Sequence, residues 1–357
     1  MKTLKYLGSI SAAVLISAGI TAQAQYTYTT LDGPLFLYFP LGISGTNIVG
    51  YYVAGPSEVH GFVYYGGTYA TLDDPLGVGN TYASGISGSN IVGWYVDTNQ
   101  MGHGFLYNGS NWITLDDPLG VGATYAQGID GANIVGYYHD TNEVSHGFLY
   151  NGSTWTTLDD PLGVNGTWAT GVSGTNIVGY YDSTNGDHGF LYNGSTWTTL
   201  DDPLGFGSTF AEGISGTNIV GYCVDSNYVA LGFLYDGSHW TALTDPLDPC
   251  ISGSGPPGTF ASGISGANIV GTYTGCRLHG FLATPIPRLT ITLSGNTPKV
   301  SWPYWNNAST GWTLQQNFDL TTTNWTASSG GVSNDGTNNF ITIPPPTGNL
   351  FFRLSQQ

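Results

Sequence analysis

Aspartate is the residue whose placement in this 357-residue chain is best suited to chemistry. One set of aspartates recurs in Asp-Asp-Pro segments, and a second set consists of Asp97, Asp140, Asp182 and Asp225. Placed together on one face of the protein, these carboxylates could bind Ca²⁺ or a cationic ligand, because hard cations are coordinated by several carboxylate and carbonyl oxygens. Alternatively, Asp before Pro caps a turn through its own backbone, and the other carboxylates are solvated. Asp-Asp-Pro lacks the ligand spacing of a calcium loop, which favours the turn.

Histidine recurs at a fixed distance from the second set of aspartates. Such an Asp and His could form a general acid–base couple or a metal site. A catalytic centre is normally single, however, so a pair copied along the chain predicts a hydrogen bond that fixes each hairpin. The three pairs are Asp97/His103, Asp140/His146 and Asp182/His188.

Aromatic side chains are the other candidate binding groups, with 24 Tyr and 10 Trp in the chain. Aromatic platforms beside acidic and amide groups hold sugars in many secreted proteins. Most of these residues recur at one strand position per repeat, however, and packing between neighbouring repeats explains that pattern better.

The elements that position these residues come from a unit that occurs six times and contains Asn-Ile-Val-Gly. A period of about 43 residues is typical of a repeat architecture. One unit contains four segments with the composition of short strands, and none of them has helical periodicity. These segments are residues 81–86, 91–96, 103–107 and 112–115. Asn108-Gly-Ser fits a hairpin turn better than a glycosylation sequon, because Asn-Gly tolerates positive φ. The Asn-Ile-Val-Gly copies begin at Asn47, Asn90, Asn133, Asn176, Asn218 and Asn268.

Four strands per unit predict an all-β fold, a six-bladed β-propeller of four-stranded blades. An aromatic residue three positions before Leu marks the fourth strand, and this pattern first occurs at Tyr28 and Leu31. The last unit, residues 259–283, has no fourth strand of its own. We therefore expect residues 26–31 to fill that place, which removes the open edge. An open solenoid or a ring of another blade number is the alternative, although an open stack would need polar caps.

The two ends of the chain differ from the repeats. Residues 1–24 contain Lys2 and Lys5, a short apolar run and a small-residue site ending at Ala24, which is the order of a secretory signal peptide. We expect a propeller over residues 25–284, a Pro-rich linker at 285–287 and a small β-sandwich over 288–357. Cleavage near Ala24 predicts a secreted or cell-surface protein.

Charge narrows the range of partners. The formal net charge is -17, and residues 25–276 contain no Lys or Arg. Nucleic acids and anionic membrane surfaces require clustered cations, so both classes of partner are excluded. No later segment is apolar for long enough to cross a membrane, and we expect an acidic monomer without membrane insertion.

Local function is expected where the repeat is broken, in the fifth and sixth units. Leu231 replaces the expected His, Cys223 replaces an aromatic residue, and extra residues enter around 249–258. Cys250 lies in that enlarged loop, and Cys276 lies in a loop on the same face of the predicted propeller. An exported protein permits a disulfide, so we predict a Cys250–Cys276 bond and a free Cys223.

Four motifs occur in the same order in each unit: His-Gly-Phe-Leu-Tyr, Thr-Leu-Asp-Asp-Pro, Ala-x-Gly-Ile and Asn-Ile-Val-Gly-Tyr-Tyr. This order resembles the bacterial extracellular repeats of the HAF type, with Gly in place of the Ala of His-Ala-Phe. The resemblance covers residues 26–283; it implies an exported protein and supplies no catalytic residues. The C-terminal region resembles fibronectin-like tail modules of secreted bacterial proteins. The segments that carry this resemblance are residues 300–303, 312–315 and 351–354.

These observations support three functional hypotheses. The first is a non-enzymatic, secreted binding or display propeller whose ligand is a glycan or an extracellular protein. It needs no cofactor unless the acidic face binds Ca²⁺. The second is an extracellular polysaccharide-acting hydrolase or lyase with its site in the central channel, where Glu212 is the one Glu in a first strand. The third is a structural envelope or matrix component.

Overall fold

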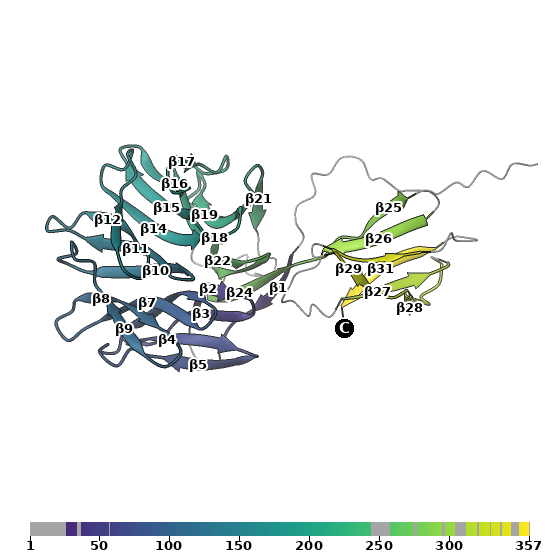
Figure 1. Cartoon of the computed structure of the whole chain (residues 1–357), viewed down its shortest axis with the longest axis horizontal. Helices are drawn as coiled ribbons and strands as arrows, with labels where there is room; N and C mark the ends of the chain where they lie inside the picture. Colours follow the sequence, from purple (N-terminus) through teal and green to yellow (C-terminus); the bar gives the residue numbers. More distant parts are fainter. Residues whose placement is uncertain are drawn as a thin grey trace, which may run out of the picture.

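The computed structural model describes residues 26–356 except 34–36, 57, 244–257, 275–276, 295–296, 304–311, 320, 329, 336–337 and 344–349. All of the regular secondary structure in this described part is β-strand (Figure 1). Consequently, no described helix is long and apolar enough to cross a membrane. The Cys250–Cys276 prediction and residues 1–24 lie outside the described residues.

Each repeat folds into four antiparallel strands, as the strand composition predicted. In the second unit these are β6 (Thr81–Ser87), β7 (Asn90–Val96), β8 (Gly102–Tyr107) and β9 (Trp112–Leu115), paired in that order. The β8–β9 connection is a turn in which Gly109 has φ of 92° and Asn108 Oδ1 accepts the Asn111 N–H at 2.8 Å. The Asn-Gly-Ser segment is therefore a turn, as expected.

The other units repeat this order. Single parallel bridges, such as Ser145 to Gly166, join three of the units into one continuous sheet. The remaining complete units are β2–β5 (Leu37–Ser44, Asn47–Gly55, Glu58–Tyr65, Thr68–Leu72), β10–β13 (Thr124–Asp130, Asn133–His139, Ser145–Tyr150, Trp155–Leu158), β14–β17 (Gly166–Ser173, Asn176–Ser183, Gly186–Tyr192, Trp197–Leu200) and β18–β21 (Ser208–Ser215, Asn218–Val224, Ala230–Tyr235, Trp240–Leu243).

The N-terminal strand completes the last unit. This unit consists of β22 (Gly258–Ser265), β23 (Asn268–Thr274), β24 (Leu278–Pro285) and β1 (Tyr26–Thr30), and β1 pairs antiparallel with β24. Tyr28 contacts Phe281 edge to face at 5.6 Å. The expected pairing of the N-terminal strand is confirmed, and it covers the edge of β24.

Backbone contacts between the inner strands close the structure into a β-propeller. Each inner strand contains a β-bulge, and a Gly lies immediately after it. A Cβ on Gly85 would lie 2.7 Å from the Gln127 carbonyl oxygen, so only Gly allows this approach. A Cβ on Gly263 would lie 2.4 Å from the Leu41 carbonyl oxygen, which joins the last unit to the first. These axial glycines are Gly42, Gly85, Gly128, Gly171, Gly213 and Gly263.

A second ring of contacts lies at the far end of the inner strands. Gly88 N donates to Ser44 Oγ at 3.2 Å, and the same bond recurs from unit to unit. Gly45 N donates to Ser265 Oγ at 3.0 Å, which links the first unit to the last. In one unit Asp130 replaces the serine and accepts the Gly174 N–H at 2.7 Å.

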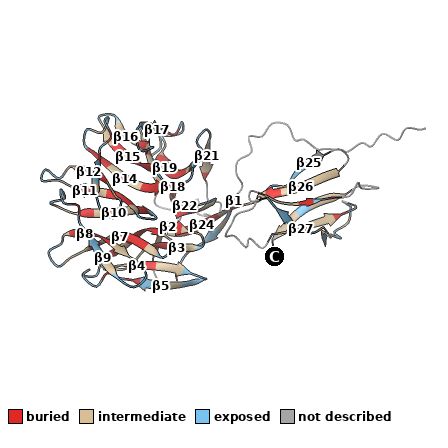
Figure 2. Ribbon diagram, in the orientation of Figure 1, coloured by how far each residue is buried: buried red, intermediate tan, exposed pale blue. Residues whose placement is uncertain are grey.

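The hydrophobic core is divided into clusters that each span two neighbouring units (Figure 2). In one cluster, Val49 and Leu72 of the first unit pack against Ala83 and Phe105 of the second. Burial between units makes each unit depend on its neighbours for a closed core, as in other repeat folds. The largest fully buried rings, one per unit, are Phe62, Phe105, Phe148, Phe190, Phe233 and Phe281.

The C-terminal region forms two small sheets. Val300 and Ile341 of the first sheet and Leu314 of the second belong to one buried cluster. The first sheet has the order β25 (Thr290–Ser294), β26 (Thr297–Pro303), β30 (Asn338–Thr342) and β29 (Ser333–Asn334), and the second β28 (Thr326–Ala327), β27 (Trp312–Asn317) and β31 (Phe351–Gln356).

Candidate binding site in the central channel

The recurring histidines bind aspartates, but the main partner is not the predicted one. His103 Nδ1 lies 3.0 Å from Asp116 Oδ1, whereas its Nε2 lies 3.7 Å from Asp97. The register of the two strands explains this choice of partner. Gly104 pairs with Leu115 across β8 and β9, so the adjacent residues His103 and Asp116 lie side by side. The equivalent distances are 2.8 Å for His60–Asp73, 2.9 Å for His146–Asp159, 2.8 Å for His188–Asp201 and 2.5 Å for His279–Asp32.

The second Asp of each Asp-Asp-Pro segment is buried and caps a turn. Asp117 Oδ1 accepts the Leu119 N–H at 2.8 Å, and Asp117 N donates to Thr124 Oγ1 at 3.0 Å. Burial raises the pKa of the Asp117 carboxyl. The turn interpretation is confirmed for these residues, so they do not add to an exposed acidic face. The equivalent residues are Asp74, Asp160 and Asp202.

Three of the candidate binding aspartates, Asp97, Asp140 and Asp225, lie in the connections after the second strands, whereas Asp182 lies near the end of β15. Asp97 Oδ1 accepts the Met101 N–H at 2.9 Å and the Asn99 N–H at 2.8 Å, which lowers the pKa of Asp97. Asp140 and Asp225 cap their loops in the same way. Asp182 instead accepts the Asn165 side-chain N–H at 3.1 Å. Among the described residues no group of three or more His, Cys, Asp or Glu is placed to hold a metal ion.

The departures in the fifth unit form one packing change. Cys223 and Leu231 pair directly across β19 and β20, where the second unit has the stacked rings of Tyr95 and His103. Cys223 is a free thiol and fully buried, and desolvation raises its pKa to about 12. It is therefore unreactive at neutral pH. Cys223 thus fills core space, and its cross-strand partner Leu231 is half-buried.

This natural replacement predicts a small effect for the same change elsewhere. Replacing His146 by Leu should lower the free energy of unfolding by about 1 kcal/mol, because a partly exposed hydrogen bond to Asp159 and a ring contact with Tyr138 are lost. Urea denaturation measures this change. His239→Leu is the control, since that side chain is 80% exposed and should have no measurable effect. A loss above about 3 kcal/mol would contradict a minor structural role.

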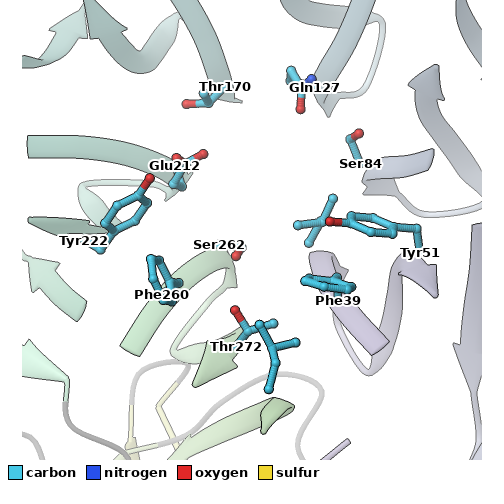
Figure 3. A pocket seen from close by; sticks show the side chains of 12 residues that line it. Phe39, Tyr51, Ser84, Gln127, Thr170, Glu212, Tyr222, Phe260, Ser262 and Thr272 are labelled. Atoms are coloured by element: carbon cyan, nitrogen blue, oxygen red, sulfur yellow. The ribbon is translucent and has the colours of Figure 1, made fainter. Parts of the chain in front are cut away.

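The residues that do vary meet in the central channel. At each β-bulge the extra residue of the inner strand lines the channel (Figure 3). Its type varies, with Ser in two units and four other types in the remaining four, whereas a Gly follows it in every unit. We call these six the bulge residues. They line a cavity of about 420 Å³. The bulge residues are Leu41, Ser84, Gln127, Thr170, Glu212 and Ser262.

Aromatic rings encircle the channel next to the bulge residues. Within a unit two rings stack, as Tyr82 and Trp94 do at 3.8 Å, and the second ring contacts the next unit edge to face, as Trp94 and Tyr125 do at 5.0 Å. This aromatic girdle confirms packing between units as the main role of these recurring aromatics. The girdle consists of Phe39, Tyr51, Tyr82, Trp94, Tyr125, Tyr137, Trp168, Tyr180, Phe210, Tyr222 and Phe260.

The girdle is interrupted in the last unit. Thr272 lies opposite Phe260 in the position that an aromatic residue fills in the other five units. The cavity extends to this place, where Thr272 and Leu278 line it together with the rings of Phe39 and Phe260 (Figure 3). The missing ring thus enlarges the channel on one side.

Glu212 supplies the one carboxyl group among the described residues that line the cavity. Desolvation raises the pKa of Glu212 to about 7. The phenols of Tyr137, Tyr180 and Tyr222 also have raised pKa values, chiefly through desolvation. The nearby Glu212 is the second cause for Tyr180 and Tyr222 and follows Tyr125 for Tyr137. All three phenols therefore stay neutral at physiological pH and present hydroxyl groups close to the acid.

Sequence reasoning identified Glu212 but missed the other five bulge residues. The signal was present, because the variable position of Ala-x-Gly-Ile is the bulge position: Ala126-Gln127-Gly128 and Ala211-Glu212-Gly213 are two examples. What the sequence could not show was the extra residue per strand, which turns this position toward the axis.

The fold and this channel define the chain as an all-β propeller with a central cavity. No known family model matches it, and no curated protein matches it. Among solved structures it is similar to a mutant of the Aleuria aurantia lectin in complex with Fucalpha1-6GlcNAc, with 16% identity over 78% of this chain and 94% of that chain and a TM-score of 0.44. The SapL1 lectin in complex with alpha methyl fucoside gives 14% identity, 77% and 94% coverage and a TM-score of 0.45.

TolB from Acinetobacter baumannii is similar at a comparable level, with 13% identity over 66% of this chain and 63% of that chain and a TM-score of 0.42. At such identities and TM-scores these likenesses carry no argument about what this chain binds.

Proposed function

We propose that this chain is an exported, monomeric six-bladed propeller that binds a carbohydrate in its central channel, and that its C-terminal region is a fibronectin-like β-sandwich used for attachment or display. The observation that carries the binding role is the set of six bulge residues, which comprise five residue types inside a frame that otherwise repeats. Selection for folding alone gives no reason for this variety at a position that faces the cavity, since the Gly that follows it is the same in every unit.

The chemistry of the cavity suits a polyhydroxylated ligand. Gln127 offers an amide, Ser84 and Ser262 offer hydroxyl groups, and Glu212 offers a carboxyl group, all of which hydrogen-bond to sugar hydroxyls. Rings of the girdle supply apolar surface beside them. A cavity of about 420 Å³ lies in the range of small-ligand sites.

A binding role is favoured over glycoside hydrolysis. Hydrolysis normally uses two carboxyl groups on either side of the scissile bond. The described lining of the cavity contains Glu212 and no second Asp or Glu. The polysaccharide-acting enzyme is therefore the weaker hypothesis.

Filling the break in the girdle tests this proposal. Thr272→Tyr restores the aromatic residue of the other units and should narrow the cavity while leaving the fold intact. Gln127→Ala removes an amide from the lining. On a glycan array, followed by calorimetry with the best ligand, both variants should bind at least roughly tenfold more weakly than the parent chain.

The matched control is Tyr228→Ala, which removes an aromatic side chain that is 85% exposed on a loop outside the channel. It should leave binding unchanged. Loss of binding in Tyr228→Ala with normal binding in both channel variants would move the site to the outer loops. Unchanged melting temperatures would show that the channel variants are folded.

A further inference from the structure

Glu212 is chemically unlike the rest of the channel. It accepts no hydrogen bond from a described residue and forms no ion pair with one, although Tyr180 and Tyr222 lie close enough to interact electrostatically with it. The chain has no Lys or Arg between residues 25 and 276 that could neutralise it. A desolvated acid without a partner is costly to retain unless something bound there compensates it.

The surroundings of Glu212 favour a positive charge over a neutral group. Rings of Tyr222, Phe260 and Phe39 line the same cavity, and aromatic faces attract cations. Asp187 interacts electrostatically with Tyr180 and Tyr222, so it adds negative potential on this side of the channel. Burial and the neighbouring Asp182 raise the pKa of Asp187 itself.

We propose that the carbohydrate bound in the channel carries a protonated amine that pairs with Glu212, which makes the ligand an amino sugar. This inference rests on the proposed function. The ammonium group donates hydrogen bonds to the Glu212 carboxylate, and such charge-assisted bonds are stronger than those of a neutral sugar hydroxyl. Glu212 has a pKa of about 7 in the free chain, so at about pH 6, where the amine is protonated and Glu212 is mostly neutral, amine binding ionises Glu212 and releases its proton to the buffer. Calorimetry is therefore done at this pH.

Calorimetry of the full chain with three probes tests this inference. The probes are glucosamine oligomers, N-acetylglucosamine oligomers of the same length, and spermidine as an amine without a sugar. We expect the glucosamine oligomers to bind roughly tenfold or more tightly than the acetylated ones. The binding enthalpy should change with the ionisation enthalpy of the buffer, because protons are released.

Variants assign the effect to one residue. Glu212→Gln should abolish the buffer dependence and the preference for the amine, so that free and acetylated oligomers bind this variant with equal affinity. Glu143→Gln makes the same chemical change on an exposed loop and should preserve both. Circular dichroism melts of both variants confirm that they are folded.

The outcomes separate this inference from the proposed function. Equal binding of free and acetylated oligomers would overturn the amine and leave carbohydrate binding in place. Spermidine binding that depends on Glu212, together with no binding of either oligomer, would contradict a carbohydrate ligand and support an amine ligand. Failure of all three probes would overturn the amino sugar, whereas carbohydrate binding itself is decided by the glycan array.

Discussion

Replacing Gly263 by Ala should lower the free energy of unfolding by about 3 kcal/mol. The added Cβ would lie 2.4 Å from the Leu41 carbonyl oxygen, a distance that real Cβ atoms do not tolerate. The obstacle is the backbone of another inner strand, which cannot rotate away as a side chain can. The strain falls where the last unit meets the first, so the ring must open or shift there.

A graded series makes this prediction specific to the axis. The Cβ at Gly128 would lie 2.7 Å from the nearest carbonyl oxygen, and that at Gly171 would lie 3.1 Å from one. Stability in urea should therefore fall in the order Gly171→Ala, Gly128→Ala, Gly263→Ala, with the greatest loss last. Gly55→Ala is the control, because its nearest atom is a Glu58 side-chain oxygen at 3.6 Å. Equal stability across the series would show that the inner strands do not touch as described.

Replacing Glu212 by Gln should remove a dependence of stability on pH. The Glu212 carboxyl ionises at its ordinary value of 4.5 when unfolded and at about 7 when folded. Between these values the unfolded chain has lost a proton that the folded chain keeps, so the free energy of unfolding decreases as pH rises. The stabilisation is fully present below 4.5 and is lost as pH passes through 7.

The size of this effect follows from the difference between the folded and unfolded pKa values of Glu212. At about 1.4 kcal/mol per pH unit, the change amounts to about 3 kcal/mol at most. Urea denaturation at a series of pH values measures it as the difference between the parent chain and Glu212→Gln. Glu143→Gln should keep the parent slope, since that residue is exposed. A parent chain and Glu212→Gln variant with the same slope would show that the channel does not desolvate this acid.

The strands and their order could be predicted because the same strand pattern occurs six times in the sequence. Turn residues such as Asn108 and Gly109 mark the ends of strands, and the position of Tyr28 before the first unit revealed the pairing of β1 with β24. The partner of His103 could not be predicted in the same way. Asp97 and Asp116 are both near His103 in sequence, and only the register of β8 against β9 decides between them.

The site was predictable only in part, for a similar reason. Glu212 attracted notice as a rare residue type, whereas Gln127 and Ser262 are ordinary polar residues in a strand. A regular strand alternates its two faces, and an extra residue at the bulge changes which side chain reaches the axis. In contrast, Cys223 and Leu231 are one exchange of a cross-strand pair of side chains, of which Cys223 is buried and Leu231 half-buried.

The separation of bulge residues from axial glycines has an evolutionary consequence. Gly128 holds the inner strands together, while Gln127 beside it contributes only to the cavity. Under the proposed function, the bulge codons control what the channel recognises. Thr170 also donates a hydrogen bond to the Ala211 carbonyl oxygen of the next unit at 2.7 Å, so the other five codons are the ones that can change without loss of a frame contact. A gene library randomised at these five codons should yield folded proteins with different ligand preferences, so the same scaffold could diversify within one lineage by point substitution alone.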